Sequence, residues 1–247
     1  MDLFKKVASI VALSLALLSS VSKSKNIQVS TIFPVHSDMY KILDLILGEA
    51  FQRIGTKSFS LKSMPGNRSL SMVYNGTYIA EAARVSKFVK NKEIIKVEES
   101  ICYLNVHTYT IERGIKIKKW PDLIEYNVAT LRGAKILEAK FKNMKMKHPV
   151  QFFTTPKQLF FALSSKNRDV EVVLSSDAVF DSIIKSNNDK NIYKSTDPLL
   201  RLKLYTLFNK KFKDLASKLS DTLLLMKNDG SYKRILARVG SPLSRCL

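Results

Sequence analysis

The sequence lacks the residue patterns on which most catalytic centres and metal sites depend. Its 247 residues include only 3 His and 2 Cys. His36, His107 and His148 lie far apart, so they do not form a cluster with the spacing of metal ligands. The sequence contains no Gly-x-Ser-x-Gly turn, no Walker loop and no His-Glu-x-x-His motif. We therefore expect no enzymatic activity, no metal site and no cofactor.

Long apolar runs are also scarce, and the main one stands at the start of the chain. Val7–Leu18 is roughly a dozen residues long, too short for a membrane-spanning helix of about 20 residues. Lys5 and Lys6 precede it and the small residues Ser20–Ser22 follow it, which is the order found in a secretory signal peptide. We expect residues 1–22 to be a cleaved signal for export to the periplasm; the alternative is an uncleaved membrane anchor.

The few cysteines leave one question open. In an exported chain, Cys102 and Cys246 either pair with each other or remain as two free thiols. A disulfide between them would hold the C-terminal tail against the body of the protein.

Acidic residues are few relative to basic ones. The chain has 41 Lys and Arg against 21 Asp and Glu, a formal net charge of +20. Most of the basic residues are lysines spread over every segment, and Lys140–Lys147 is the densest run. Nucleic-acid surfaces usually concentrate arginine and interleave aromatic side chains. We interpret the charge as mainly a solvated surface with a preference for anionic ligands, and we expect no nucleic-acid partner.

The first third of the chain alternates between segments typical of strands and segments typical of helices. Ser37 is a suitable N-cap for the first helix and Gly55 a suitable end for it. This alternation favours a parallel sheet covered by helices. The predicted segments are, in order, Ile27–Phe33, Asp38–Ile54, Ser58–Lys62, Arg68–Tyr74 and Tyr78–Arg84.

A second alternating unit follows two extended segments, and the end of the chain is predicted to be helical. Thr155-Pro156 with Gln158 forms a capping box that starts one of its helices. We predict a helix from Asp197 to about Phe208, then two more helices. The other predicted segments are Ile94–Val97, Ile101–Ile111, Asn127–Leu131, Ala134–Phe141, Val150–Phe153, Val170–Leu174, Ala178–Ile184, Phe212–Met226 and Tyr232–Arg238.

Several stretches, taken in order, resemble a known family. The resemblance is to the bacterial extracellular solute-binding proteins of family 3, the amino-acid-binding components of ABC transporters, and specifically to their short, divergent members. The stretches are Gly66–Leu70, Val73–Gly76, Glu81–Val85, Trp120–Leu123, Val128–Gly133, Leu159–Leu163, Asp169–Leu174 and Leu223–Tyr232.

The resemblance implies an α/β fold of two lobes, the type II periplasmic-binding-protein-like fold, with a mostly parallel sheet flanked by helices in each lobe. Lobe 1 would comprise residues 25–105 and 196–247, and lobe 2 residues 106–195. A ligand would close the lobes about two extended crossovers. Ile79 stands where amino-acid-binding members usually carry Asp, so the resemblance favours a small polar or anionic ligand more than an amino acid in particular.

Arginines at predicted strand ends are the strongest candidates for binding such a ligand. Arg84 ends a strand, and its guanidinium matches a carboxylate bidentately, or it forms an internal salt bridge with Glu81. Arg68 stands at a helix start and Arg132 beside Gly133, which allows a close backbone approach.

Other candidates follow strands in the same way. Phe33 and His36 come after the first strand and could form one wall of a pocket, although a Phe in such a position is more commonly a core residue. Asp177 follows a strand of lobe 2 and either meets a ligand cation or caps the next helix. Glu81 completes the candidate set.

The sequence therefore predicts a monomeric periplasmic protein that delivers a small ligand to an ABC transporter permease or a receptor in the inner membrane. Two other hypotheses remain open. One keeps the fold but makes the protein a ligand sensor or a scaffold without a transport role. The other makes it a basic secreted protein that binds anionic polymers, with a steep salt dependence.

Overall fold

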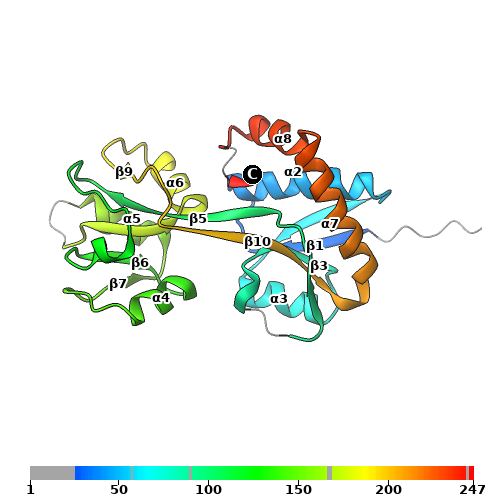
Figure 1. The fold of residues 1–247 in the computed structure, drawn as a ribbon, viewed down its shortest axis with the longest axis horizontal. Coiled ribbons are helices and arrows are strands. Elements are labelled where there is room, and N and C mark those ends of the chain that lie inside the picture. Colours follow the sequence, from blue (N-terminus) through cyan, green and yellow to red (C-terminus); the bar gives the residue numbers. More distant parts are fainter. Residues whose placement is uncertain (1–25, 57, 89–90, 166–168, 243–244) are drawn as a thin grey trace, which may run out of the picture.

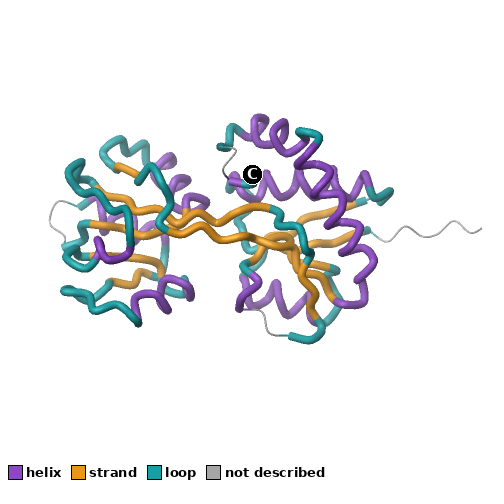
Figure 2. The backbone as a smooth tube through the Cα atoms, viewed as in Figure 1, coloured by secondary structure: helices purple, strands orange, loops and turns teal. Residues whose placement is uncertain are grey.

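The chain folds into two lobes joined by a pair of long strands (Figure 1). The computed structural model describes residues 26–56, 58–88, 91–165, 169–242 and 245–247, so the predicted signal, residues 1–22, lies outside the described residues. The joining strands are β5 (Cys102–Thr110) and β10 (Leu200–Asn209), which pair antiparallel with Leu204 opposite Cys102. Figure 2 shows these strands crossing together from one lobe to the other.

Lobe 1 is a sheet with helices on both faces, in which β1, β2 and β3 run parallel and β10 runs antiparallel to β3 and β4. Ser37 caps α2 by accepting a hydrogen bond from the Tyr40 backbone N–H, and Gly55 follows the helix with a φ of 85°. Strands pair in the order β2-β1-β3-β10. The elements are β1 (Ile27–Thr31), α2 (Asp38–Arg53), β2 (Phe59–Ser63), α3 (Gly66–Tyr74), β3 (Ala80–Arg84), η1 (Ser86–Phe88), β4 (Ile94–Lys96), η3 (Lys210–Phe212), α7 (Lys213–Asn228) and α8 (Ser231–Val239).

Lobe 2 continues the same hydrogen-bonded ladder in the order β5-β8-β6-β7, with β6 parallel to both its neighbours. Thr155 and Gln158 form the predicted capping box of α5. The elements are η2 (Trp120–Leu123), β6 (Val128–Leu131), α4 (Lys135–Lys142), β7 (Gln151–Phe153), α5 (Pro156–Ser164), β8 (Val172–Ser176), α6 (Asp177–Ser186) and β9 (Tyr193–Lys194).

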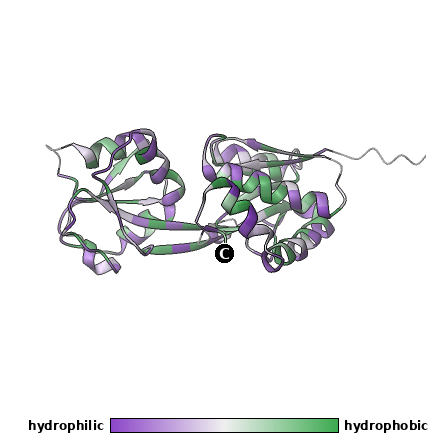
Figure 3. Ribbon diagram, turned by 90° about the horizontal axis from the view of Figure 1, so that it is seen from above, coloured by the Kyte–Doolittle hydropathy of each residue, from purple (hydrophilic) through white to green (hydrophobic). Residues whose placement is uncertain are grey.

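Apolar side chains gather inside each lobe. The lobe 1 core joins the buried stripes of α2, α7 and α8 to β1 and β3, and it includes Cys102 and Cys246. Lobe 2 has one core beneath α5 and α6 and another beneath α4 and η2. Ala178 of α6 packs in the lobe 1 core, so the amino end of α6 contacts the other lobe. Figure 3 shows hydrophobic and hydrophilic residues alternating along the helices and the crossing strands running along one side of the molecule.

These features confirm the predicted two-lobed, periplasmic-binding-protein-like α/β fold, with one correction. The helix predicted from Asp197 to Phe208 is wrong, because this segment forms the strand β10. β10 hydrogen-bonds to β3 and β4 in lobe 1 and to β5 at the crossover. Leu200, Leu202 and Leu204 alternate with polar residues, a period of two that fits a strand better than a helix.

Candidate functional site

The carboxyl ends of the strands in the two lobes face each other across the crossover. In lobe 1, β3 runs antiparallel to β10, so that its last residue, Arg84, lies opposite Tyr205. In lobe 2, β8 runs antiparallel to β5, with its last residue, Ser176, opposite Val106. Because β1 and β2 run with β3, and β6 and β7 run with β8, every one of these strands ends toward the opposite lobe (Figure 1). Open α/β sheets bind ligands at such ends.

Helices begin at the same two edges. α2 and α3 start after β1 and β2, and α4, α5 and α6 start after β6, β7 and β8. A helix amino end carries a partial positive charge and presents free backbone N–H groups. The two edges that face each other are therefore rich in groups that favour a negatively charged ligand.

Arg84 and Glu81 form a bidentate ion pair at the end of β3. Arg84 donates from Nε to Glu81 Oε2 and from Nη2 to Glu81 Oε1, both at 2.7 Å, and from Nη2 to the Gly66 carbonyl oxygen at 3.1 Å. The Glu81 side chain is fully buried, whereas 22% of the Arg84 side chain is exposed. Arg84 therefore forms the internal salt bridge with Glu81, and its part in ligand binding stays a prediction.

The environment of Glu81 sets its protonation. Burial raises the pKa of Glu81 above its ordinary value, and the hydrogen bonds and charge of Arg84 oppose this rise. Ser69 of α3 lies beside the pair and donates to Ser30 Oγ at 2.8 Å. This network ties α3 to β1 and β3 behind the site.

The other arginine candidates reach solvent at the interlobe edges. Arg68 is exposed in the first turn of α3, and Arg132 is exposed between β6 and α4. Next to Arg132, Gly133 adopts a φ of 85° and donates its backbone N–H to Glu138 at 2.7 Å. Among the described residues, neither arginine has an ion-pair partner, so both are open to an anion from solvent.

The two candidates after β1 differ in burial. Phe33 is 6% exposed and packs in the lobe 1 core, whereas His36 is exposed beside the start of α2. Core packing explains the burial of Phe33. The predicted contribution of Phe33 and His36 to ligand binding stays a prediction.

Asp177 is buried at the opposite edge, where β8 passes into α6. It is 3% exposed, and its Oδ1 accepts a hydrogen bond from the Ala178 backbone N–H at 2.7 Å. Its Oδ2 lies 3.3 Å from Nη2 of Arg245, which is 5% exposed. The carboxylate thus meets a cation from the protein itself.

Two features of this region were missed by sequence reasoning. Arg245 approaches Asp177 across 68 positions of sequence, and no local pattern indicates such a contact. The second is a hollow of about 510 Å³ at the amino end of α5, lined by Phe152, Phe153, Thr154, Gln158 and Phe161. The capping box and the run of aromatic residues around it are the signals that could have indicated an apolar recess beside a helix start.

The described residues offer neither a group of three or more His, Cys, Asp and Glu side chains that could hold a metal ion nor a helix long and apolar enough to cross a bilayer.

Comparisons with known proteins support the fold. No family model matches the chain. An uncharacterised protein of Shewanella oneidensis is 24% identical over 211 residues, covering 81% of this chain and 76% of the relative. The probable amino-acid ABC transporter extracellular-binding protein YtmK of Bacillus subtilis has a similar structure, with a TM-score of 0.71, 16% identity, and coverage of 87% of this chain and 97% of that one. A histidine kinase sensor domain with similarity to periplasmic binding proteins gives a TM-score of 0.61 with 14% identity, over 87% of this chain and 96% of that one.

These structural neighbours share the two-lobed fold with this chain. Because their identities to it are low, they establish the fold alone.

Proposed function

We propose that this protein is a periplasmic solute-binding protein that captures a small anionic molecule between its lobes and delivers it to an ABC transporter. The observation that carries the proposal is the opposition of strand ends and helix starts across the β5–β10 crossover. A fold of two lobes on a two-strand hinge allows closure around a ligand. The extracellular-binding protein of Bacillus subtilis with the same fold supports the transport role.

The charges at the two edges support an anion as the ligand. Arg68 and Arg132 are exposed, and Arg84 is partly exposed, all next to helix amino ends. A carboxylate or phosphate placed there would gain charge-assisted hydrogen bonds from guanidinium and backbone groups. The recess lined by Phe153 and Phe161 offers room for an apolar portion of the same ligand.

Thermal unfolding of the mature protein against a panel of organic acids, amino acids, polyamines and sugars tests the proposal. A ligand at 100 times its Kd stabilises the folded state by about 2.7 kcal/mol. For a chain of this size that corresponds to a rise in Tm of roughly 5–10 °C. Small-angle scattering with the ligand bound should show a smaller radius of gyration, because the lobes close.

Arginine variants locate the site. Arg132→Ala should weaken binding at least tenfold. Arg113→Ala is the matched control, because Arg113 is an exposed lobe 2 arginine beyond the outer end of β5 and contacts Tyr193. Equal affinity in both variants would contradict an interlobe site at Arg132.

A sensor function is the second candidate, supported by the structural likeness to a histidine kinase sensor domain. A sensor would bind a ligand with the same residues, but deletion of the gene would alter transcription of target genes without slowing uptake of that ligand. A transporter component would show the reverse.

A further inference from the structure

Asp177 stands where a ligand cation could be recognised, yet it already has a cationic partner. It is the first residue of α6, directly after β8, at an edge that faces lobe 1. Nη2 of Arg245 lies 3.3 Å from its Oδ2, and both side chains are at least 95% buried. A buried carboxylate requires a partner, because desolvation of an isolated charge is very costly. Arg245 fills that requirement from within the chain.

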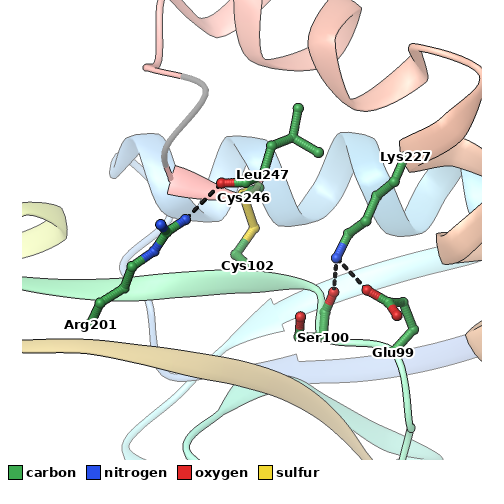
Figure 4. The surroundings of a disulfide bond; sticks show 7 residues. All are labelled: Glu99, Ser100, Cys102, Arg201, Lys227, Cys246 and Leu247. Atoms are coloured by element: carbon green, nitrogen blue, oxygen red, sulfur yellow. Dashed lines mark hydrogen bonds and ion pairs between the residues drawn. A yellow bond between two sulfur atoms is a disulfide. The ribbon is translucent and has the colours of Figure 1, made fainter.

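Arg245 is held in place by its neighbours in the C-terminal tail. Cys246 is bonded to Cys102 at the start of β5. Arg201 of β10 donates from Nη2 to the Leu247 carbonyl oxygen at 2.6 Å. Figure 4 shows these contacts on the crossover side of α2. Residues 245–247 are therefore fixed to both crossing strands, and Arg245 reaches lobe 2 from that anchor.

The Cys246–Cys102 bond and the Arg201–Leu247 hydrogen bond act as a tether for the C-terminal tail. The local geometry indicates that this tether, more than the hydrogen bond to Asp177, sets the position of the Arg245 guanidinium. At 3.3 Å the contact with Asp177 is long for a charge-assisted hydrogen bond. Nε of Arg245 is buried and makes no hydrogen bond with any described residue. A freely placed arginine would adopt a shorter, bidentate arrangement such as that of Arg84 with Glu81.

The nearby groups leave Asp177 dependent on Arg245. Asp181 of α6 is 4.0 Å from Nη2 of Arg245, but it also accepts hydrogen bonds from Tyr109 and Lys194. Loss of the Arg245 guanidinium would leave Asp181 paired. Asp177 would keep only the Ala178 backbone N–H among its contacts with described residues.

We propose that Arg245 is a tethered counter-ion that occupies the place of a ligand cation beside Asp177, so that the interlobe site selects anions that lack an ammonium group. This inference rests on the proposed function. Glu81 is committed to Arg84 in the same way, whereas Arg68 and Arg132 have no ion-pair partner among the described residues. The unpaired side chains left to bind a ligand are therefore positively charged at both interlobe edges, Arg68 in lobe 1 and Arg132 in lobe 2.

Isothermal titration calorimetry with matched ligand pairs tests the inference. Succinate and L-aspartate, and likewise glutarate and L-glutamate, differ by one α-ammonium group. The wild-type protein should bind each dicarboxylate at least tenfold more tightly than its amino derivative. Arg245→Gln should reduce that preference at least tenfold, because the ammonium group can then pair with Asp177. The control Arg113→Gln should leave the preference unchanged.

Further variants guard against misfolding. Arg245→Lys keeps the positive charge and should retain the wild-type preference. In the double variant Asp177→Asn, Arg245→Gln the buried charge is gone, so it should fold without gaining affinity for amino acids. If Arg245→Gln does not fold, binding to the wild-type protein still tests the inference. The inference is overturned if the wild type binds the amino acids more tightly than the dicarboxylates and Asp177→Asn weakens that binding.

The possible failures are distinguishable. Binding of dicarboxylates and amino acids with the same preference in the wild type and in Arg245→Gln overturns the counter-ion role and leaves the proposed function intact. Failure of both proteins to bind any member of the pairs or of the wider panel overturns the proposed function and, with it, this inference.

Discussion

Cys246 is bonded to Cys102, 144 residues earlier in the chain, and both side chains are fully buried in the lobe 1 core. The bond joins the C-terminal tail to the first residue of β5, at the point where the chain leaves lobe 1 for lobe 2. It resolves the question that the sequence left open, since the two cysteines pair.

Removal of this bond should destabilise the protein. A disulfide that closes a long loop restricts the unfolded chain, and its loss typically costs about 2–4 kcal/mol. The variant Cys102→Ala, Cys246→Ala should show that decrease in the free energy of unfolding in guanidinium chloride. The control is the wild type unfolded with and without dithiothreitol. An unchanged midpoint would show that the bond does not constrain the unfolded chain.

Glu81 should make stability depend on pH. Because burial raises its pKa in the folded state, the protonated form is favoured by folding. Its contribution to stability is fully present below about pH 4.5 and is lost as the pH rises through the folded pKa. The free energy of unfolding of Glu81→Gln, measured from pH 4 to 8, should lack this decrease. If the free energies of unfolding of the variant and the wild type change with pH in parallel, the raised pKa of Glu81 is contradicted.

Replacement of Arg84 should lower the free energy of unfolding more than replacement of Glu81. Arg84→Met would leave the buried Glu81 carboxylate without its cation, and breaking a buried pair in this way costs about 3 kcal/mol or more. Equilibrium unfolding at pH 7 measures the loss. The double variant Glu81→Gln, Arg84→Met should recover part of it, and a double variant as unstable as Arg84→Met would contradict the explanation.

His107 should make stability depend on pH in the direction opposite to that of Glu81. Desolvation lowers its pKa below 6.5, and the neighbouring Lys194 adds to the effect. Its Nδ1 lies 3.0 Å from the Ser195 carbonyl oxygen, which can only accept, so the neutral ring carries its proton there. The stability that His107 contributes is present above about pH 6.5 and is lost as the pH falls through the folded pKa. His107→Gln should therefore flatten the decrease in Tm between pH 7 and 5.

Tyr109 and Tyr232 should resist ionisation in the folded state. Burial raises the pKa of both, and the Tyr109 hydroxyl donates to Asp181 at 2.7 Å. An alkaline titration followed at 295 nm should show two of the nine tyrosines ionising only on unfolding. Smooth ionisation of all nine tyrosines would contradict the burial of Tyr109 and Tyr232.

Tyr109→Phe should lower the free energy of unfolding, because it removes a hydrogen bond to a charged group, which is worth about 1.5–3 kcal/mol.

Gly133 and Gly114 provide a matched pair in lobe 2. An added Cβ meets no atom within 4 Å at either position, but only Gly133 has a positive φ, of 85°. Gly133→Ala should therefore cost about 1–2 kcal/mol of stability, and Gly114→Ala almost nothing. Equal Tm values for the two variants would show that the β6–α4 turn relaxes.

Local signals were sufficient for most elements of this fold. The Ser37 cap, the Thr155–Gln158 capping box and the glycine after α2 place helix ends within a few residues of their positions. The strand ends could also be located, which brought Arg84, Arg132 and Asp177 into the candidate set. Each of these depends on contacts within a few residues, which the sequence contains.

Two predictions failed or stayed open for different reasons. The helix predicted from Asp197 to about Phe208 relied on Asp197-Pro198 as a helix start, although Leu200, Leu202 and Leu204 already alternate with the period of a strand, and the segment pairs with β3, β4 and β5. Whether Asp177 faces a ligand or an internal partner could not be inferred from local sequence, since Arg245 is 68 residues away.

The sequence by itself determined the alternation of strands and helices, the caps and the excess of positive charge, because these follow from periodicity and local hydrogen bonding. Only the tertiary structure decided how that charge is distributed at the two edges. The folded chain commits Glu81 to Arg84 and Asp177 to Arg245, and it fixes Arg245 through Cys246 and Cys102. The Asp177–Arg245 and Cys102–Cys246 contacts depend on distances between segments far apart in the sequence, and the Glu81–Arg84 pair, which the sequence left as an alternative, is strengthened by burial.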